Sequence, residues 1–205
     1  GGIALAARLR QLNVPTIVID KNQNPGDSWR NRYHSLCLHD TVWYDHMPYL
    51  PFPDHWPIFS PKDKIGDWLE MYTKIMEINY WGSTECLNAS YDQKKQTWEV
   101  IADREGQEIK LTPRHLILAT GMSGMPQFPD IKNIDKFNGD YCHSSGFQNG
   151  LEYRGKNAVI VGSNNSAHDI AAELWEQGAA NVTMIQRSAT TVAKSKTLTE
   201  LSNNG

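Results

Sequence analysis

The feature that most restricts the fold is a strand, a tight turn and a helix encoded after residue 156. The sequence predicts a strand over residues 157–161, which leads into Gly162, and a second strand over residues 181–186. A helix between two such strands completes a βαβ unit. A helix that starts at the turn of residues 162–167 directs its first backbone N–H groups toward a bound pyrophosphate. The segment therefore predicts a nucleotide-binding unit.

The start of the chain has the pattern of the second half of another such unit. Gly1 and Gly2 open an Ala- and Leu-rich segment, which predicts a helix that begins at glycine. The β-branched run of residues 14–20 follows and ends in Asp20, 18 residues after Gly2. A carboxylate at this position accepts hydrogen bonds from ribose hydroxyls and repels a 2′-phosphate. This first site therefore predicts FAD, with NAD as the less favoured choice.

The second unit differs from the first at its turn and at its end. The turn carries Gly162, Asn164 and Ala167 where three glycines are usual, and Asn tolerates left-handed backbone geometry better than most residues. The strand ends at Arg187 and Ser188, a cation and a hydroxyl that suit the 2′-phosphate of NADP(H). A solvated charge at a strand end is the alternative for Arg187. The contrast with the acid of the first unit predicts two different nucleotides.

Three further elements are predicted between the two units. Ser60 has the residue type of a helix N-cap, and a helix is predicted from Pro61 to about Met76 because apolar residues follow at helical spacing. Alternating segments separated by polar turns predict a small antiparallel meander near residues 84–112. The apolar run of residues 114–119 predicts another buried strand.

Composition excludes several classes of function. The chain is 40% hydrophobic and 21% charged, as in an ordinary globular protein, and its net charge of −3 gives no reason to expect nucleic acid as a partner. Cys37, Cys86 and Cys142 are isolated thiols, which predicts a reducing, cytoplasmic setting and neither a disulfide framework nor a zinc site. No apolar run approaches the roughly 20 residues that span a bilayer. His168 and Asp169 are adjacent on a predicted helix and point to different faces, so no metal is predicted.

A motif lies between the two nucleotide units and connects them to a known family. Residues 137–147 follow the pattern Phe-x-Gly-x3-His-x3-Phe, with His143 in its centre and Phe147 at its end. Together with two nucleotide turns, this motif resembles the flavin-containing monooxygenase family. The resemblance extends over essentially all of the chain and includes a Gly-x2-Trp-x2-Arg-Tyr run at residues 26–33 and an Ala-Thr-Gly turn at residues 119–121.

The resemblance implies an α/β fold with two doubly wound, Rossmann-like units. It implies an FAD-binding domain over residues 1–150 and the start of an inserted NADP-binding domain over residues 151–205. The chain lacks an initiator Met and opens inside a predicted glycine turn. We therefore expect a fragment truncated at both ends that is inactive on its own.

The activity implied by the resemblance is that of an FAD- and NADPH-dependent monooxygenase. Such an enzyme forms a C4a-hydroperoxyflavin and inserts one oxygen atom of O2 into a small organic substrate. In this family, Phe at position 147 favours N- or S-oxygenation over Baeyer–Villiger chemistry. A family Asn near the flavin C4a atom has no counterpart in the sequence around His39, so the substrate stays open. His143 is expected to position the linker between the domains and not to carry a proton.

The expected cofactor-binding residues follow from the motifs and from the resemblance. Those expected for FAD are Gly1, Gly2, Asp20, Lys21, Ser28, Trp29, Arg32, His39, Ala119, Thr120 and Gly121. Those expected for NADPH are Gly162, Ser163, Asn164, Asn165, Ser166, Arg187 and Ser188.

Two alternative functions stay open, and the oligomeric state is not predicted. The first is a Baeyer–Villiger or oxidative-decarboxylating monooxygenase acting on a carbonyl substrate, and the second is a non-catalytic NAD(P)-binding module. A pyridine nucleotide–disulfide reductase shares the two-nucleotide architecture but needs a cysteine pair soon after the first unit. Cys37 has no second cysteine nearby, so the sequence argues against disulfide reduction.

Overall fold

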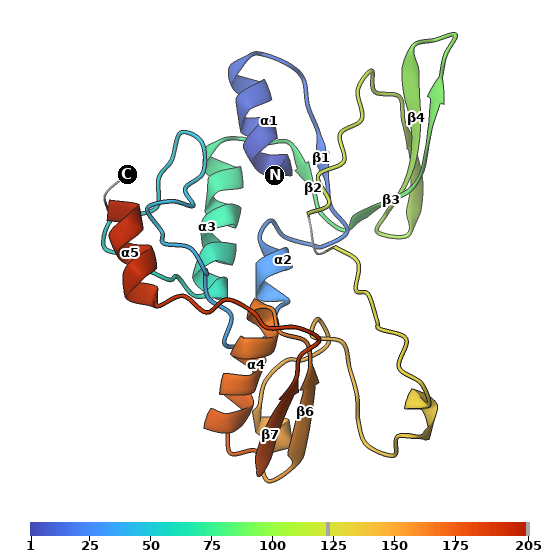
Figure 1. Ribbon diagram of the computed structural model, residues 1–205. Helices are drawn as coiled ribbons and strands as arrows, with labels where there is room; N and C mark the ends of the chain where they lie inside the picture. The colour runs from blue at the N-terminus through green and yellow to red at the C-terminus, as the bar shows by residue number, and fades with distance from the viewer. Residues whose placement is uncertain (122–123, 204–205) are drawn as a thin grey trace. The chain divides into compact units, whose positions relative to one another are not determined.

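The computed structural model describes residues 1–121 and 124–203 (Figure 1). Residues 122–123 of the predicted FAD-binding range and residues 204–205 of the predicted NADP-binding range lie outside this description. The chain packs as two compact units, which we call the first unit (Gly1–Arg30, His46–Pro53, Asp63–Gly124) and the second unit (Asn31–Asp45, Asp54–Lys62, Met125–Gly205). The predicted division at residue 150 concerns nucleotide binding and stays a prediction.

The first unit begins with a helix and a short parallel strand pair. Helix α1 spans Gly2–Gln11, as predicted, and strand β1 spans Val18–Ile19. Strand β1 is shorter than the predicted run of residues 14–20 because its parallel partner, β2, contains only Tyr80–Trp81. The sequence did not predict β2.

Helix α3 spans Lys62–Ile75 and supplies much of the core of the first unit. Tyr72 is fully buried on its apolar face, and its hydroxyl donates to the Pro48 carbonyl at 2.9 Å. The helix lies where the sequence predicted it, but the predicted cap is wrong. Ser60 is buried, and its hydroxyl donates at 3.1 Å to the Pro57 carbonyl behind it. Its side chain therefore closes the preceding loop, because that carbonyl is the acceptor within reach.

The predicted meander is confirmed as a three-stranded antiparallel sheet. Strands β3 (Thr84–Asp92), β4 (Thr97–Arg104) and β5 (Gln107–Leu111) follow one another in order. The β4–β5 turn contains Glu105 and Gly106, both with positive φ. A short polar turn of this type joins neighbouring antiparallel strands.

The predicted buried strand at residues 114–119 is not formed. This segment is extended, but no strand of the described residues pairs with it, and Ile117 and Leu118 are 55% and 79% exposed. A strand of a parallel sheet is buried only when neighbouring strands and covering helices enclose it. The prediction of a buried strand here is therefore wrong for the described residues, because no neighbouring strand encloses the segment.

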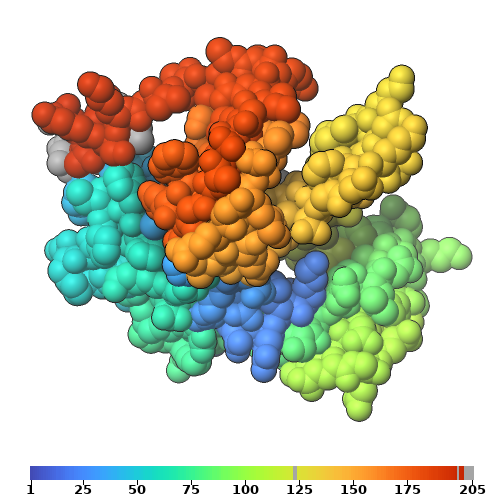
Figure 2. All heavy atoms as spheres, turned by 90° about the horizontal axis from the view of Figure 1, so that it is seen from below, coloured from blue at the N-terminus to red at the C-terminus, as the bar shows by residue number. Residues whose placement is uncertain are grey.

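The second unit contains the predicted βαβ arrangement. Strands β6 (Asn157–Val161) and β7 (Asn181–Ile185) pair in parallel, and helix α4 (Asn165–Glu176) connects them. Ile170 and Leu174 of α4 are buried, which fixes the helix against the strands. In the space-filling view, the orange atoms of this region form one continuous body (Figure 2).

The remaining short elements were not predicted. They are helix α2 (Asp27–Arg30) in the first unit, and the 3₁₀ helices η1 (Ile134–Lys136) and η2 (Leu151–Tyr153) and helix α5 (Ser195–Asn203) in the second. Within residues 1–121 and 124–203, the structure contains no helix with the length and apolar character to cross a membrane.

Candidate functional site

The start of α1 packs closely against the turn predicted to approach FAD. A Cβ atom on Gly2 would lie 3.4 Å from the Cβ of Ala119 and 3.8 Å from the Cγ1 of Val18. This is the close helix–strand packing for which the third glycine of a dinucleotide turn is used. Gly1 precedes the helix, and no side chain of the described residues caps its first N–H groups. The geometry fits a helix start that faces a phosphate.

Asp20 is held firmly at the end of β1. Its backbone N–H donates to the Trp81 carbonyl at 3.1 Å, and its carbonyl accepts from the Thr84 N–H at 2.8 Å. Its Oδ1 atom accepts from the backbone N–H and the side-chain amide of Asn22, at 2.9 and 3.0 Å. Burial and the charge of Asp20 both raise the pKa of Tyr80. The neighbouring Lys21 is exposed. Asp20 therefore has the fixed position that ribose recognition requires.

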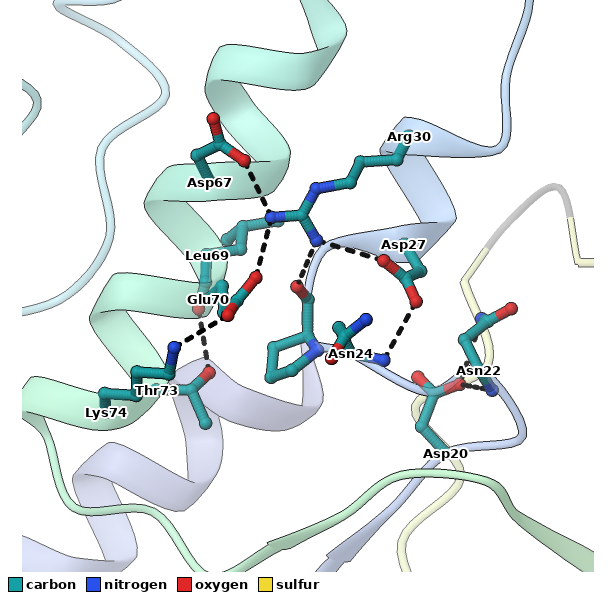
Figure 3. A network of polar contacts seen from close by, with 11 residues as sticks. Asp20, Asn22, Asn24, Asp27, Arg30, Asp67, Leu69, Glu70, Thr73 and Lys74 are labelled. Carbon is teal, nitrogen blue, oxygen red and sulfur yellow. Dashed lines mark hydrogen bonds and ion pairs between the residues drawn. The ribbon is translucent and has the colours of Figure 1, made fainter.

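Helix α2, which carries Ser28 and Trp29, is anchored on α3 by one arginine. The Arg30 guanidinium donates to Asp27 of its own helix at 3.0 Å, and to Asp67 and Glu70 of α3 at 2.8 and 2.9 Å (Figure 3). An arginine fork of this kind holds several acceptors in a fixed geometry. The network therefore sets the position of the Ser28 and Trp29 backbone relative to α3.

The loop before α2 touches the backbone of α3 without a side chain between them. Gly26 has a φ of +90°, and a Cβ atom on it would lie 2.3 Å from the Gly66 carbonyl oxygen. Only glycine fits both the backbone conformation and the contact. This explains why the Gly-x2-Trp run begins with glycine.

The turn of the second unit has the predicted position and a different internal geometry. Gly162 has a φ of +141°, and its N–H donates to the Ile185 carbonyl at 2.9 Å. Asn164 is extended, with a φ of −91° and a ψ of 176°, so its tolerance of left-handed geometry is not used. Its side chain instead caps α4 by accepting from the Asn165 N–H at 2.9 Å. Capping is the role that Asn performs best at the start of a helix.

Arg187 and Ser188 lie two and three residues after Ile185, the last residue of β7, and both are exposed. The bond between Gly162 and Ile185 places the start of the turn at the carboxyl end of β7, two residues before Arg187. The structure thus brings the predicted phosphate turn and the predicted 2′-phosphate residues to the same edge of the β6–β7 pair.

Three polar residues of α4 bind the loop of residues 33–39, and the sequence did not predict this. We call Asn165, Asp169 and Glu173 the α4 stripe. They are spaced by four residues, so they lie on one face of the helix. Glu173, only 3% exposed, accepts from the Ser35 N–H at 3.3 Å, from the Ser35 hydroxyl, and from the Gly150 N–H at 3.0 Å. The sequence does contain a pattern that indicates this face, namely polar residues at helical spacing next to the apolar Ile170 and Leu174.

Asp169 forms the middle of the stripe and binds two side chains of the loop. The Tyr33 hydroxyl donates to its Oδ2 at 2.8 Å, and the His39 Nε2 lies 3.0 Å from the same atom. Burial raises the pKa of Asp169, but the hydrogen bonds from His39 and Tyr33 outweigh it and hold the pKa below its usual range. The bond to Asp169 raises the pKa of His39, and burial raises that of Tyr33 to about 12. Among the described residues, no group of three His, Cys, Asp or Glu side chains could hold a metal ion.

His143 lies in a local turn of the second unit. Its Nδ1 accepts from the Ser145 N–H at 3.1 Å and lies 2.9 Å from the Ser145 hydroxyl. Phe147 is buried and stacks on Tyr153 with ring centroids 5.7 Å apart. The contacts of the motif residues thus shape the linker, in keeping with the positioning role expected for His143. That role stays a prediction.

The predicted site residues divide between the two units. Gly1, Gly2, Asp20, Lys21, Ser28, Trp29, Ala119, Thr120 and Gly121 belong to the first unit. Arg32, His39 and His143 belong to the second unit, together with residues 162–166, Arg187 and Ser188. The Nε atom of Arg32 is buried without a hydrogen-bond partner among the described residues.

The fold and these sites define a class of protein. Each unit contains a parallel strand pair, β1–β2 in the first and β6–β7 in the second, and parallel strands that follow a glycine turn and a helix are typical of the dinucleotide-binding folds of oxidoreductases. A family model described as pyridine nucleotide-disulphide oxidoreductase matches residues 1–203. The chain belongs to this family. The cysteines of the described residues, Cys37, Cys86 and Cys142, are free thiols.

Similar proteins confirm the resemblance to flavin monooxygenases and the fold class. The chain is 32% identical to the probable indole-3-pyruvate monooxygenase YUCCA3 of Arabidopsis thaliana, over 92% of this chain and 44% of that protein. Its fold is similar to that of the flavin-containing monooxygenase from Stenotrophomonas maltophilia, with 22% identity, a TM-score of 0.85, and coverage of 96% of this chain and 58% of that one. The OTEMO complex with FAD and NADP gives 24% identity, a TM-score of 0.74, and coverage of 99% and 41%. The chain spans about half of the length of the curated relatives it matches.

Proposed function

We propose that this chain forms the nucleotide-binding part of an FAD- and NADPH-dependent monooxygenase. The observation that carries the proposal is the pair of strand–helix units with opposite charges at their ends, Asp20 in one and Arg187 in the other. The relatives support it, since the curated proteins it matches are named as monooxygenases and OTEMO is a complex with FAD and NADP.

In this proposal, FAD is bound in the first unit by Gly1, Gly2, Asp20, Lys21, Ser28, Trp29, Ala119, Thr120 and Gly121. Arg32 and His39, which the sequence also predicted for FAD, belong to the second unit and are not part of this set. No side chain of the described residues caps the first N–H groups of α1, and Gly1 and Gly2 have no side chains of their own, which suits a pyrophosphate. Asp20 accepts hydrogen bonds from the ribose. Bound FAD and NADPH supply hydride transfer and the activation of O2, while the protein binds and orients them.

NADPH is bound in the second unit by residues 162–166, Arg187 and Ser188. The helix start behind Gly162 and Asn164 favours the pyrophosphate, and the guanidinium of Arg187 favours the 2′-phosphate. His143 acts in this proposal by holding the linker through its bonds to Ser145.

Two substrate classes are candidates, each favoured by a different observation. The curated relatives are named indole-3-pyruvate monooxygenases, and indole-3-pyruvate is a 2-oxo acid, so they favour the oxidation of a carbonyl compound. Phe147 at the end of the linker motif favours the oxygenation of an amine or a sulfide. We place the 2-oxo acid class first, since the buried stacking of Phe147 on Tyr153 is sufficient to explain an aromatic residue there.

Isotope labelling tests the proposed function directly. The FAD-loaded protein is supplied with NADPH, ¹⁸O2 and either a 2-oxo acid or a tertiary amine, and the products are analysed by mass spectrometry. A monooxygenase places one labelled atom in the organic product for each NADPH consumed. Consumption of NADPH with formation of hydrogen peroxide alone, for every substrate supplied, contradicts the proposal.

Arg187→Ala is expected to weaken the binding of NADPH about tenfold to a hundredfold and to leave NADH binding nearly unchanged. The variant removes a charge-assisted hydrogen bond that only the 2′-phosphate can accept. Isothermal titration with both nucleotides measures the two affinities. Lys194→Ala, which removes another exposed cation of the same unit, is the matched control. Equal losses for NADPH and NADH, or equal losses in both variants, contradict the assignment of Arg187.

A further inference from the structure

The imidazole of His39 contacts two residues of the α4 stripe, Asp169 and Asn165. Its Nε2 lies 3.0 Å from Oδ2 of Asp169, and its Nδ1 lies 2.9 Å from the Nδ2 of Asn165. Asn165 is the first residue of α4 and lies within the turn proposed to bind NADPH. One side chain of a distant loop therefore contacts both an acid of the helix and an amide at the helix start.

The hydrogen bonds define which nitrogen of the neutral ring carries the proton. Ionised Asp169 only accepts hydrogen bonds, so Nε2 of His39 carries the proton and donates to it. The other nitrogen, Nδ1, then has a lone pair that accepts from the Asn165 amide N–H. In this state the carbonyl oxygen of the amide is turned away from the ring. The Asn165 side chain is exposed, so that oxygen is presented at the start of α4.

A second proton on His39 reverses this arrangement. Protonated Nδ1 becomes a donor, and two donors cannot form a hydrogen bond. The amide of Asn165 must therefore rotate, so that its oxygen accepts from the ring and its NH2 group is turned outward. A phosphate prefers an outward N–H donor and a nearby positive charge to an outward carbonyl oxygen.

We propose that His39 is a positioning residue that couples the protonation of its ring to the orientation of the Asn165 amide, and thereby to the affinity of this turn for NADP(H). The inference rests on the proposed function, since it assumes that the turn binds this nucleotide. Protonated His39 corresponds to the state of higher affinity. By linkage, bound nucleotide favours the protonated ring in return.

The groups around His39 set the range in which it titrates. Asp169 of α4 faces the ring directly, Asp40 adds its charge from the same loop, and both raise the pKa of His39, although burial opposes them. Tyr33 and His168 each lower the pKa of Asp169. Burial, and after it the charge of Asp169, raises the pKa of the nearby Cys37 thiol. The nucleotide affinity should therefore be high below the pKa of His39, and should fall as the pH rises through a range above the ordinary His value of about 6.5.

The test measures the dissociation constant of NADP⁺ for the protein between about pH 5.5 and about pH 9, a range chosen to span His titration. His39→Gln keeps a donor toward Asp169 but removes the titrating ring. His168→Gln removes the exposed neighbouring ring of the same helix and is the matched control. The 2′-phosphate of the ligand titrates equally with all three proteins, so its effect cancels in their ratios.

From the low to the high end of this pH range, we expect the NADP⁺ affinity of the wild type and of His168→Gln to fall. The affinity of His39→Gln should fall about tenfold less. This factor corresponds to the free energy of one charge-assisted hydrogen bond. In parallel, NMR titration of His39 should show its pKa rising when NADP⁺ binds. Binding with parallel pH profiles in all three proteins overturns this inference and leaves the proposed function intact. Absence of NADP⁺ binding at every pH overturns both.

Discussion

Gly26→Ala is expected to lower the free energy of unfolding by about 3 kcal/mol or more. The methyl group would be 2.3 Å from the Gly66 carbonyl oxygen, a backbone atom that cannot move aside without displacing α3. The residue would also keep a φ of +90°, which costs an L-amino acid about 1–2 kcal/mol by itself. Overpacking adds about 1–3 kcal/mol. Urea-induced unfolding followed by tryptophan fluorescence measures the change.

Gly106→Ala separates these two causes. Gly106 has a φ of +82°, close to that of Gly26, but a Cβ atom on it would meet nothing within 4 Å. We expect this control to lose only the backbone contribution, about 1–2 kcal/mol. Equal losses in both variants would show that the added methyl group at Gly26 meets no steric penalty at the Gly66 carbonyl.

Glu173→Ala is the substitution with the second large expected effect, a loss of about 3 kcal/mol. The carboxylate is 3% exposed and accepts the N–H groups of Ser35 and Gly150 as well as the Ser35 hydroxyl. Alanine leaves the N–H of the buried Gly150 without an acceptor, at about 1–3 kcal/mol, and also removes the acceptor of the two Ser35 donors, which lie on an exposed residue and keep access to water. The denaturation midpoint in urea, compared with that of the wild type, measures this loss.

Two variants complete this experiment. Glu176→Ala removes an exposed carboxylate from the end of the same helix and is expected to change stability by less than about 0.5 kcal/mol. Glu173→Gln keeps one acceptor oxygen and should lie between the wild type and Glu173→Ala. A Glu173→Ala protein as stable as Glu176→Ala would exclude the α4 stripe as a support for the loop.

Local sequence patterns predicted the elements whose stability depends on near neighbours. Helices α1, α3 and α4, the meander, and the β6–β7 pair were all predicted correctly, because each has a clear period and a turn at its ends. The run of residues 114–119 has an equally clear pattern but forms no strand, since pairing depends on a partner that periodicity does not identify. Strand β2 was not predicted, because a strand of two residues is too short to show a period.

The candidate site shows the same limit. Spacing alone predicted that Gly2 would pack closely and that Asp20 would end a strand, because both follow from the order of elements in a dinucleotide unit. The partners of the α4 stripe were not predictable in this way. Asp169 and Tyr33 are separated by 136 positions, and nothing in either local sequence identifies the other.

The 136 positions between Tyr33 and Asp169 delay the contact between them during synthesis of the chain. Translation at roughly 5–20 residues per second exposes the loop of residues 33–39 on the ribosome for about ten seconds before α4 emerges to meet it. Through this interval the buried Tyr33 lacks the α4 carboxylate of Asp169 that accepts from its hydroxyl. The same interdependence means that residues 151–205 expressed by themselves would present Asp169 and Glu173 to solvent. A protein chemist who wants residues 151–205 apart from the first unit should therefore keep residues 31–45, 54–62 and 125–150 with them, and not cut at the predicted domain boundary.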